Sequence, residues 1–526
     1  MALLWETTAF QVVSDAAPRQ LIVQGSSQLI GERNFMDSHI VVRTRDDIID
    51  YVNARPSQPK ILLLVTIALG GIFIDAYDLV VLGTATEQLT EQFGLSPFHL
   101  SMIMTAMPFG ALIGALVGGI YTDKFGRKLL FTIDLILLVV ATIGAALAPN
   151  ATVLLIFRFL MGIGIGLDMP VALSFISELS NTKTKGRNVN YWQVFWYIAT
   201  VTTAFIVIAV YALGAGDDAW RWSVGLGAVF AVIILILRFM YLKESPMWAA
   251  KNSSLNDAAK TLEKTYNISV RIEDDGGSDR PEEAQNPTKL PLGIIFNKRY
   301  GRRTILAMVI AATQGMEYYA IGLYIPVLLT TILNGGRLET LGGTAVINVF
   351  GILGGLAGAH LSARFGMRRL AIMGYIIVIF SMAFIGLLSG AVSIWLIAGV
   401  IGLFIFGHSS GPGPQGKSIG ALSYPTILRG YGTGAVEAAS RVGGMFGTFF
   451  FPVLLAAFGL DGTMLFLILA PAVGLVAALI IKWDPTNKGP EIEAEHDDVI
   501  KEIERSGVVS AISESRRPPF QTSSKN

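Results

Sequence analysis

The stretch of sequence that decides the fold is apolar apart from two acids and reads Gly70-Gly71-Ile72-Phe73-Ile74-Asp75-Ala76-Tyr77-Asp78-Leu79-Val80-Val81-Leu82. We expect a membrane-spanning helix over 61–86, because about 20 apolar residues are long enough to cross a bilayer. Asp75 and Asp78 are three residues apart and share roughly one helix face. An ionised side chain at the bilayer centre costs about 2.5–3.5 kcal/mol. The two acids therefore predict a partner, a bound proton or a water-filled path.

The composition indicates a polytopic, all-α membrane protein. Hydrophobic residues make up 52% of the 526 residues and charged residues only 15%, whereas soluble domains carry about 25% charged residues. The chain has no cysteine, which excludes disulfides and thiolate metal sites. We expect no metal, no cofactor and no catalytic residue. Lys and Arg number 40 against 39 Asp and Glu, and we expect no nucleic-acid partner.

The apolar runs of membrane-crossing length fall into two groups of six. The first group covers about 61–86, 98–121, 129–148, 151–177, 190–213 and 221–242, and the second about 304–333, 341–363, 369–388, 391–426, 432–457 and 462–482. We expect two six-helix bundles in five segments: an N-terminal tail at 1–59, a bundle at 60–242, a central loop at 243–303, a bundle at 304–482 and a C-terminal tail at 483–526.

The distribution of Lys and Arg predicts the orientation. Cations such as Lys124, Lys185, Arg364 and Arg429 lie in alternate loops, and the opposite loops at 87–100, 148–151 and 388–392 contain no Lys or Arg. Because cytoplasmic loops carry the excess of Lys and Arg, we expect both tails and the central loop in the cytoplasm. The protein would be multi-pass in the inner or plasma membrane.

The two halves resemble each other at matched loops. Gly119-Ile120-Tyr121-Thr122-Asp123-Lys124-Phe125-Gly126-Arg127-Lys128 follows the second span, and Ala363-Arg364-Phe365-Gly366-Met367-Arg368-Arg369 follows the eighth. Transporters built from repeats bind substrate between the repeats near the bilayer midplane. We therefore expect a site between the halves.

The loop at 119–128 resembles the signature of the major facilitator superfamily, and the resemblance covers about 60–485. Local matches resemble its sugar and metabolite proton-symporter branch: Glu178 with Lys185-Gly186, Lys243-Glu244-Ser245-Pro246-Met247-Trp248, Gln314-Gly315 and Tyr324-Ile325-Pro326. Asp75-Ala76-Tyr77-Asp78, Arg158 and Asp168-Met169-Pro170 resemble the phosphate and organic-anion symporters within it. Ala363 and Leu422 depart from the family pattern and predict a weaker charge network at the cytoplasmic face of the second half.

Five charged residues inside the spans are candidates for proton coupling. Asp78 and Arg158 lie at similar depth on the first and fourth spans, so we expect them to pair, either as a fixed salt bridge or as a proton switch. The resemblance favours the switch. Asp75 would share the proton, and Asp168 resembles the inward proton acceptor of the phosphate symporters. Glu317 of the seventh span is the fifth candidate.

The second half supplies the candidate cations for a substrate. Lys417 and Arg441 would face a central cavity with Glu317 between the halves, where Arg binds a carboxylate or phosphate through two parallel hydrogen bonds. An alternative is a local pair of Arg441 with Glu437, four residues earlier. Gln193 and Gln314 match polar positions of the sugar-porter site, and the aromatic residues that could form its walls are Trp192, Trp196, Tyr318 and Tyr319.

Two further motifs bear on the mechanism. Gly119, Asp123, Gly126 and Arg127 predict a conformational latch, in which the Asp123 carboxylate lies at a helix N-terminus. The family resemblance implies that this helix is the start of the eleventh span, near Gly430. The run Gly411-Pro412-Gly413-Pro414-Gln415-Gly416-Lys417-Ser418 fits the phosphate-loop pattern, but its prolines and apolar surroundings predict a broken helix instead of a nucleotide site.

Together these features predict a monomeric secondary transporter and not an enzyme. We expect proton-coupled uptake of a small anionic metabolite, such as an organic acid or phosphate, by alternating access, with the substrate, protons and the bilayer as its partners. Three alternatives remain open: a sugar or polyol symporter, an exporter of drugs or metabolites, and a transporter-like sensor that signals through its tail and central loop.

Overall fold

The protein is seen in a computed structural model that describes residues 40–56, 58–273, 293–326, 328–329 and 337–495. Residues 1–39 of the expected N-terminal tail, 274–292 of the expected central loop and 496–526 of the expected C-terminal tail lie outside this part. In the first half, the long helices are α2 (Pro59–Gly83), α4 (Pro97–Phe125), α5 (Arg127–Ala146), α6 (Ala151–Leu179), α7 (Lys185–Ala212) and α8 (Ala219–Tyr241). The short elements α3 (Thr86–Phe93) and η1 (Gly216–Asp218) follow α2 and α7.

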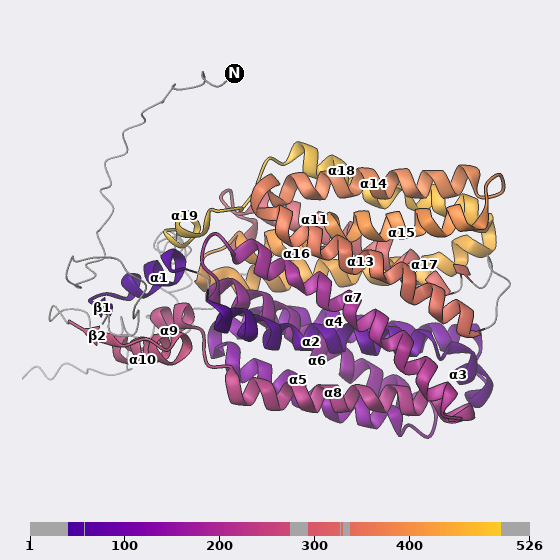
Figure 1. The fold of residues 1–526 in the computed structure, drawn as a ribbon, viewed down its shortest axis with the longest axis horizontal. Helices are drawn as coiled ribbons and strands as arrows, with labels where there is room; N and C mark the ends of the chain where they lie inside the picture. The colour runs from indigo at the N-terminus through magenta and orange to yellow at the C-terminus, as the bar shows by residue number, and fades with distance from the viewer. Residues whose placement is uncertain (1–39, 57, 274–292, 327, 330–336, 496–526) are drawn as a thin grey trace, which may run out of the picture.

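The second half repeats this arrangement. Its long helices are α11 (Gly301–Ile321), α13 (Arg337–Phe365), α14 (Met367–Leu388), α15 (Ile394–Ser410) with α16 (Pro412–Leu422), α17 (Thr426–Leu467) and α18 (Leu469–Ile480), and η2 (Ile294–Phe296) precedes α11. Gly459 has a φ of 65° inside α17 and separates the eleventh span from the twelfth. Figure 1 shows the two halves as neighbouring bundles with nearly parallel long axes.

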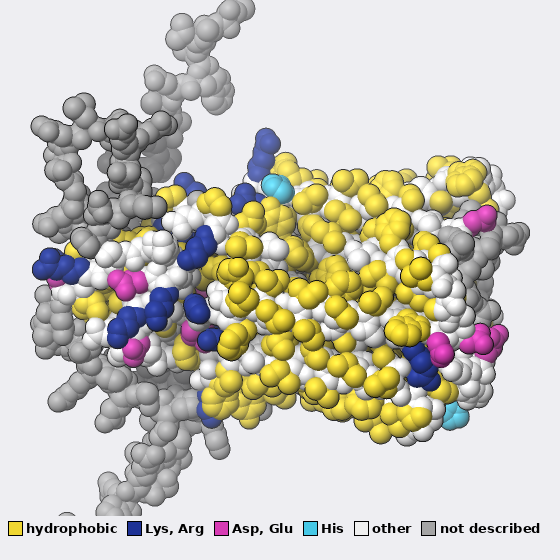
Figure 2. Space-filling view, turned by 60° about the horizontal axis from the view of Figure 1, so that its bottom comes forward, with side chains coloured by type: hydrophobic (Ala, Val, Ile, Leu, Met, Phe, Trp, Pro, Cys, Tyr) yellow, Lys and Arg dark blue, Asp and Glu magenta, His cyan; other side chains and the backbone are white. Residues whose placement is uncertain are grey.

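The described residues confirm the all-α membrane architecture. Ten helical stretches are long and apolar enough to cross a membrane, and α11 and the part of α17 before Gly459 complete two sets of six. Figure 2 shows hydrophobic side chains along the long sides of the molecule and Lys and Arg gathered near one end. The apolar sides face lipid because the bilayer offers them an apolar solvent.

The end that carries most of these cations is covered by short elements, and we call it the capped end. Here β1 (Ile40–Val42) pairs in parallel with β2 (Val270–Ile272), beside α1 (Arg45–Ala54), α9 (Pro246–Asn252) and α10 (Leu255–Tyr266). The last short helix, α19 (Gly489–Glu493), lies at the same end (Figure 1).

The halves pack through α4 against α17 and through α7 against α13. Glycine allows the close approach of α4 and α17: a Cβ on Gly119 would lie 2.8 Å from both the Gly430 oxygen and the Gly434 Cα. The halves are therefore in direct backbone contact near the capped end.

Candidate functional site

Four ionisable side chains form a buried cluster between the halves, which we call the central charge cluster: Asp75, Lys417, Glu437 and Arg441. Arg441 Nη2 of α17 lies 2.6 Å from Asp75 Oδ2 of α2. Glu437 lies between the two cations, with Arg441 Nε at 2.8 Å and Lys417 Nζ at 2.9 Å. Each of the four residues is at most 4% exposed. The Asp75–Arg441 pair therefore joins the first half to the second.

The central charge cluster is internally neutral when all four groups are ionised. The sequence predicted that Lys417 and Arg441 face a central cavity with Glu317. In the structure they instead form ion pairs with Asp75 and Glu437. The alternative local pair of Arg441 with Glu437 is present. Arg441 also donates to the Tyr319 hydroxyl at 3.0 Å, and Lys417 Nζ lies 4.4 Å from the centre of the Trp192 ring.

Asp78 and Arg158 are neighbours, but their side chains do not form the expected ion pair. Arg158 Nη1 donates to the backbone carbonyl of Asp78 at 2.9 Å. The Asp78 carboxylate accepts a hydrogen bond from Thr142 at 3.4 Å, and its other oxygen has no hydrogen-bond partner in the protein. Because Arg158 Nε and Nη2 are also without hydrogen-bond partners, a rotation of the Asp78 carboxylate could form the pair.

Asp168 is held inside the first half by a residue that the sequence analysis missed. Arg238 of α8 donates to Asp168 at 2.6 Å and to the Ala68 carbonyl at 2.6 Å, and it lies 3.5 Å from Asp134. Arg238 lies near the end of the sixth span, where a long cation is expected to extend to the membrane surface. It instead points inward and is 3% exposed.

Glu317 contacts His408, a residue to which the sequence analysis assigned no role. His408 Nδ1 of α15 lies 3.0 Å from Glu317 Oε1 of α11, and both side chains are buried. The predicted wall aromatics form one cluster here. Trp196 donates to the Tyr318 hydroxyl at 2.8 Å, and the Tyr318 ring stacks on His408 with 5.0 Å between centroids.

The two predicted glutamines occupy different places. Gln314 donates to Ser440 at 3.0 Å, which bonds α11 to α17. Gln193 of α7 and His408 of α15 both lie close to Gly413. Among the described residues here, the buried atoms that make no hydrogen bond within the protein include Trp192 Nε1, Gln193 Oε1 and Glu317 Oε2. Leaving a buried polar group unpaired costs about 1–3 kcal/mol, so these atoms are suited to receive a polar ligand.

A second set of charges closes the capped end, and we call it the capped-end gate: Asp123, Arg127, Glu178, Arg429 and Glu493. Asp123 accepts hydrogen bonds from the backbone N–H groups of Gly430 and Tyr431 at 3.2 and 3.1 Å. Arg127 donates to Asp123 at 3.0 Å and to Glu178 at 2.7 Å. Arg429 donates to Glu178 at 3.1 Å. The Asp123 carboxylate therefore lies where it was expected, near the start of α17.

The second half contributes more charge to this gate than was predicted from the departures of Ala363 and Leu422 from the family pattern. Glu493 of α19 pairs with Arg429 and accepts hydrogen bonds from Thr426. Burial alone would raise the pKa of Glu493, but the charges of Arg429 and Lys185 and the Thr426 hydrogen bonds hold it below its usual value. The predicted weakness is therefore wrong for this gate, because an acid beyond the twelfth span supplies the charge.

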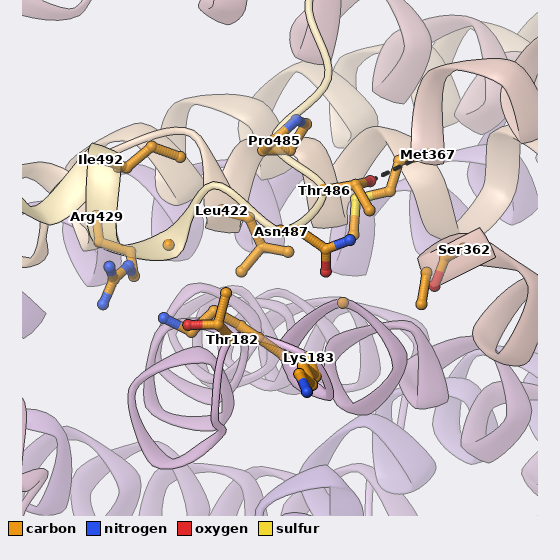
Figure 3. Close-up of a pocket in the computed structure, with 14 residues that line it drawn as sticks. Thr182, Lys183, Ser362, Met367, Leu422, Arg429, Pro485, Thr486, Asn487 and Ile492 are labelled. Carbon is orange, nitrogen blue, oxygen red and sulfur yellow. Dashed lines mark hydrogen bonds between the residues drawn. The ribbon is translucent and has the colours of Figure 1, made fainter. Parts of the chain in front are cut away.

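The space between the halves at the capped end is nearly filled. Figure 3 shows it between ribbons of the first and second halves, with Thr182 and Lys183 on one side and Leu422, Asn487 and Ile492 on the other. The cavity volume is about 20 Å³, enough for about one water molecule. In this conformation the capped end is closed to a metabolite.

The run that fits the phosphate-loop pattern is a helix break, as the sequence predicted. Gly411 has non-helical backbone angles between α15 and α16, and Pro412 is at the N-terminus of α16. The break brings Gly413 close to both His408 and Gln193. It therefore shapes the space beside the three unpaired polar atoms.

The fold is that of a polytopic membrane protein with buried charges between its two halves. The family described as "Sugar (and other) transporter" matches residues 63–493. The chain belongs to this family, within the major facilitator superfamily, and is a transporter and not an enzyme.

Individual relatives are distant but extend over most of the chain. The putative metabolite transport protein YaaU of Escherichia coli is 27% identical over 421 residues, which are 80% of this chain and 91% of that protein. The arabinose-proton symporter of Bacillus subtilis is 25% identical over 65% of this chain and 75% of that protein. The fold is similar to a solved structure of the proton:xylose symporter XylE bound to 6-bromo-6-deoxy-D-glucose, with a TM-score of 0.70, 20% identity and coverage of 83% and 98%.

Proposed function

We propose that the protein takes up a small neutral polyhydroxylated metabolite, of the sugar or polyol class, together with protons. One observation carries this proposal: the central charge cluster is neutral in itself, while buried polar atoms of Trp192 and Gln193 in the first half and of Glu317 in the second stay unpaired. Hydroxyl groups both donate and accept hydrogen bonds and would pair with all three atoms. Relatives named as symporters of arabinose and galactose support the same class.

Proton coupling would use the two acids of α2. Asp78, with its free oxygen beside Arg158, is the proposed entry point for the proton, and Asp75 would share it. Protonation of Asp75 would remove the charge that holds Arg441, and with it an ion pair between the halves. Asp168, already bound by Arg238, would release the proton toward the capped end. The loss of an interhelical ion pair would let the halves move apart.

Uptake requires the capped-end gate to face the cytoplasm. The cations gathered at this end support that orientation, because positive charge is retained on the cytoplasmic side. Substrate would then enter from the opposite end and leave once Asp123 releases Gly430 and Tyr431. We propose that the chain does this as a monomer in the inner or plasma membrane, with both tails in the cytoplasm.

The test uses purified protein in proteoliposomes with an imposed pH gradient. Wild-type protein is expected to accumulate D-xylose, D-glucose or myo-inositol, and Asp78→Asn is expected to abolish accumulation while retaining exchange of labelled for unlabelled substrate. Asp461→Asn is a matched control, because this acid bonds Ser389 on the surface. Accumulation by Asp78→Asn equal to wild type would refute the coupling assignment.

A second candidate is the uptake of an organic acid or phosphate, favoured by the presence of Lys417 and Arg441 between the halves. Protonation of Asp75 or Glu437 would leave this cluster with net positive charge, so that anion binding would follow proton binding. Lys417→Ala and Arg441→Ala should then each abolish phosphate or succinate uptake, whereas a sugar carrier should tolerate at least one of them. Outward movement of substrate against its own gradient, driven by proton flow in the opposite direction, would identify an exporter.

A further inference from the structure

The contact between His408 and Glu317 lies outside the proton path and outside the central charge cluster. His408 Nδ1 is 3.0 Å from Glu317 Oε1, and the two side chains are at most 1% exposed. The imidazole stacks between two rings of the second half, Tyr318 at 5.0 Å and Phe404 at 6.4 Å between centroids. Stacking on both neighbours fixes the ring plane, so His408 holds one Glu317 oxygen in a defined place.

The other oxygen of Glu317 has no partner within the protein. Glu317 Oε2 is buried and makes no hydrogen bond within the protein. The charged and titratable groups around the pair come from several helices: Lys417 of α16, Tyr318 of α11 and Tyr375 of α14. No salt bridge within 4.0 Å joins a cation to Glu317 Oε2 in the described part of the chain. The free oxygen is therefore an available acceptor.

Gly413 allows close approach of the two halves beside this pair at the helix break. A Cβ on Gly413 would lie 2.9 Å from His408 Nε2 and 3.1 Å from Gln193 Nε2, closer than packed side chains tolerate. Nitrogens from α15 and α7, which belong to different halves, thus approach the same point of the break. The unpaired Gln193 Oε1 belongs to the same side chain.

We propose that His408 is a positioning residue for substrate recognition, which fixes Glu317 so that its free oxygen accepts a hydrogen bond from a hydroxyl of the cargo. This inference rests on the proposed function and narrows it, because the cargo must offer a neutral donor to a buried carboxylate. His408 acts through Glu317 and does not itself contact the cargo. Gln193 supplies a further acceptor and donor from the first half.

A double-mutant cycle tests this assignment. The readout is the equilibrium dissociation constant for D-xylose, D-glucose and myo-inositol, measured by the intrinsic tryptophan fluorescence of purified protein. His408→Phe keeps the stacking but removes the hydrogen bond to Glu317. Leaving one buried hydrogen-bond partner unpaired costs about 1–3 kcal/mol, so His408→Phe and Glu317→Gln should each weaken binding about tenfold. The double variant should bind no worse than Glu317→Gln alone.

Rescue and control variants separate positioning from folding. His408→Asn places an amide nitrogen near the Nδ1 position and should restore most of the affinity. Tyr424→Phe removes another buried hydrogen bond of α11, the 2.7 Å contact to Thr304, and should lower the melting temperature without changing affinity. Additive losses in the double variant, or no rescue by His408→Asn, would overturn the role of His408.

The same measurement distinguishes failure of this inference from failure of the proposed function. Binding of phosphate or succinate alone, or of no probe, would overturn recognition of a neutral hydroxyl by Glu317. Sugar binding with the expected cycle but without proton-driven accumulation in proteoliposomes would leave the role of His408 intact and refute the proposed symport.

Discussion

Glu437 decides, at the scale of a single residue, whether two cations can stay buried between the halves. It is the only acid of the central charge cluster, as described, that lies within ion-pair distance of both Lys417 and Arg441. Glu437→Gln would leave the cluster with one uncompensated charge. Breaking a buried pair by removing one partner costs about 3–5 kcal/mol. We expect a clear drop in the thermal unfolding midpoint of the purified protein.

The control for this prediction restores the charge balance. The double variant Glu437→Gln with Lys417→Gln returns the cluster to neutrality and should recover most of the lost stability. A double variant that unfolds at the same temperature as Glu437→Gln would show that charge balance is not what stabilises this site.

Glu493 makes the stability of the capped-end gate depend on pH. Its pKa in the folded protein is below the usual value of 4.5, so the stability from its pair with Arg429 is fully present above about pH 4.5 and is lost as the pH falls through the lower folded value. At pH 7, Glu493→Gln should destabilise the protein by about 1–3 kcal/mol. The difference in stability between Glu493→Gln and wild type should shrink below pH 4. Thermal unfolding of both proteins between pH 7 and 3.5 measures this difference.

Single residues also show where sequence reasoning reaches its limit. The pair of Asp123 with Arg127 could be predicted because one loop motif carries both the acid and its local arginine, whereas the partner near Gly430, 307 residues away, was expected only from the family resemblance. Arg238, His408 and Glu493 could not, because each partner is 64 to 91 residues away along the chain. Nothing local shows that Arg238 points inward or that α19 folds back onto Arg429. Burial of charge requires a partner, but it does not say which one.

At the scale of elements, the contact of α4 with α17 depends on two glycines that face each other, Gly119 and Gly434. We expect Gly119→Val to separate these helices and to open the capped end, since a Cβ at position 119 already meets backbone atoms of α17 at 2.8 Å. The chain has no cysteine, so S362C provides a single reporter on the closed cavity, where Ser362 is buried. Labelling of S362C by a maleimide should be several-fold faster in the Gly119→Val variant than without this substitution.

A matched glycine provides the control for this element. Gly399 of α15 has no atom within 4 Å of its Cβ position, and Gly399→Val should leave the labelling rate of S362C unchanged. Equal acceleration by both substitutions would indicate general loosening instead of release of the α4–α17 contact.

The elements themselves were largely readable from the sequence. Apolar length located the spans, because the bilayer imposes one length and one solvent on all of them. Side-chain pairing between helices was not readable in the same way. Glu437 and Arg441 share α17, whereas Lys417 lies on α16, and the rotation of α17 about its axis decides whether Glu437 reaches Lys417. Periodicity places residues on a helix face but does not orient that face among several neighbours.

At the scale of the whole molecule, the N-terminal segment and the central loop brace the capped end. Arg55 donates to the Leu179 carbonyl at 3.2 Å, and its guanidinium lies 3.6 Å from the centre of the Tyr266 ring in α10. Asn53 accepts hydrogen bonds from the Thr182 N–H at 3.1 Å and from Lys185 at 3.3 Å. These bonds hold the loop that directly follows Glu178 of the gate. Because α1 also contacts α19, the brace reaches both halves.

We therefore expect loss of this brace to favour opening at the capped end without preventing folding. Arg55→Ala, and more strongly removal of residues 1–55, should speed maleimide labelling of S362C and leave the chain inserted in the membrane. Lys260→Ala, an exposed position on α10, is the control and should leave labelling unchanged. Opening requires Glu178 to separate from Arg429, and a freely moving loop after Glu178 makes that separation easier. Unchanged labelling after removal of residues 1–55 would mean that the gate ion pairs alone keep this end closed.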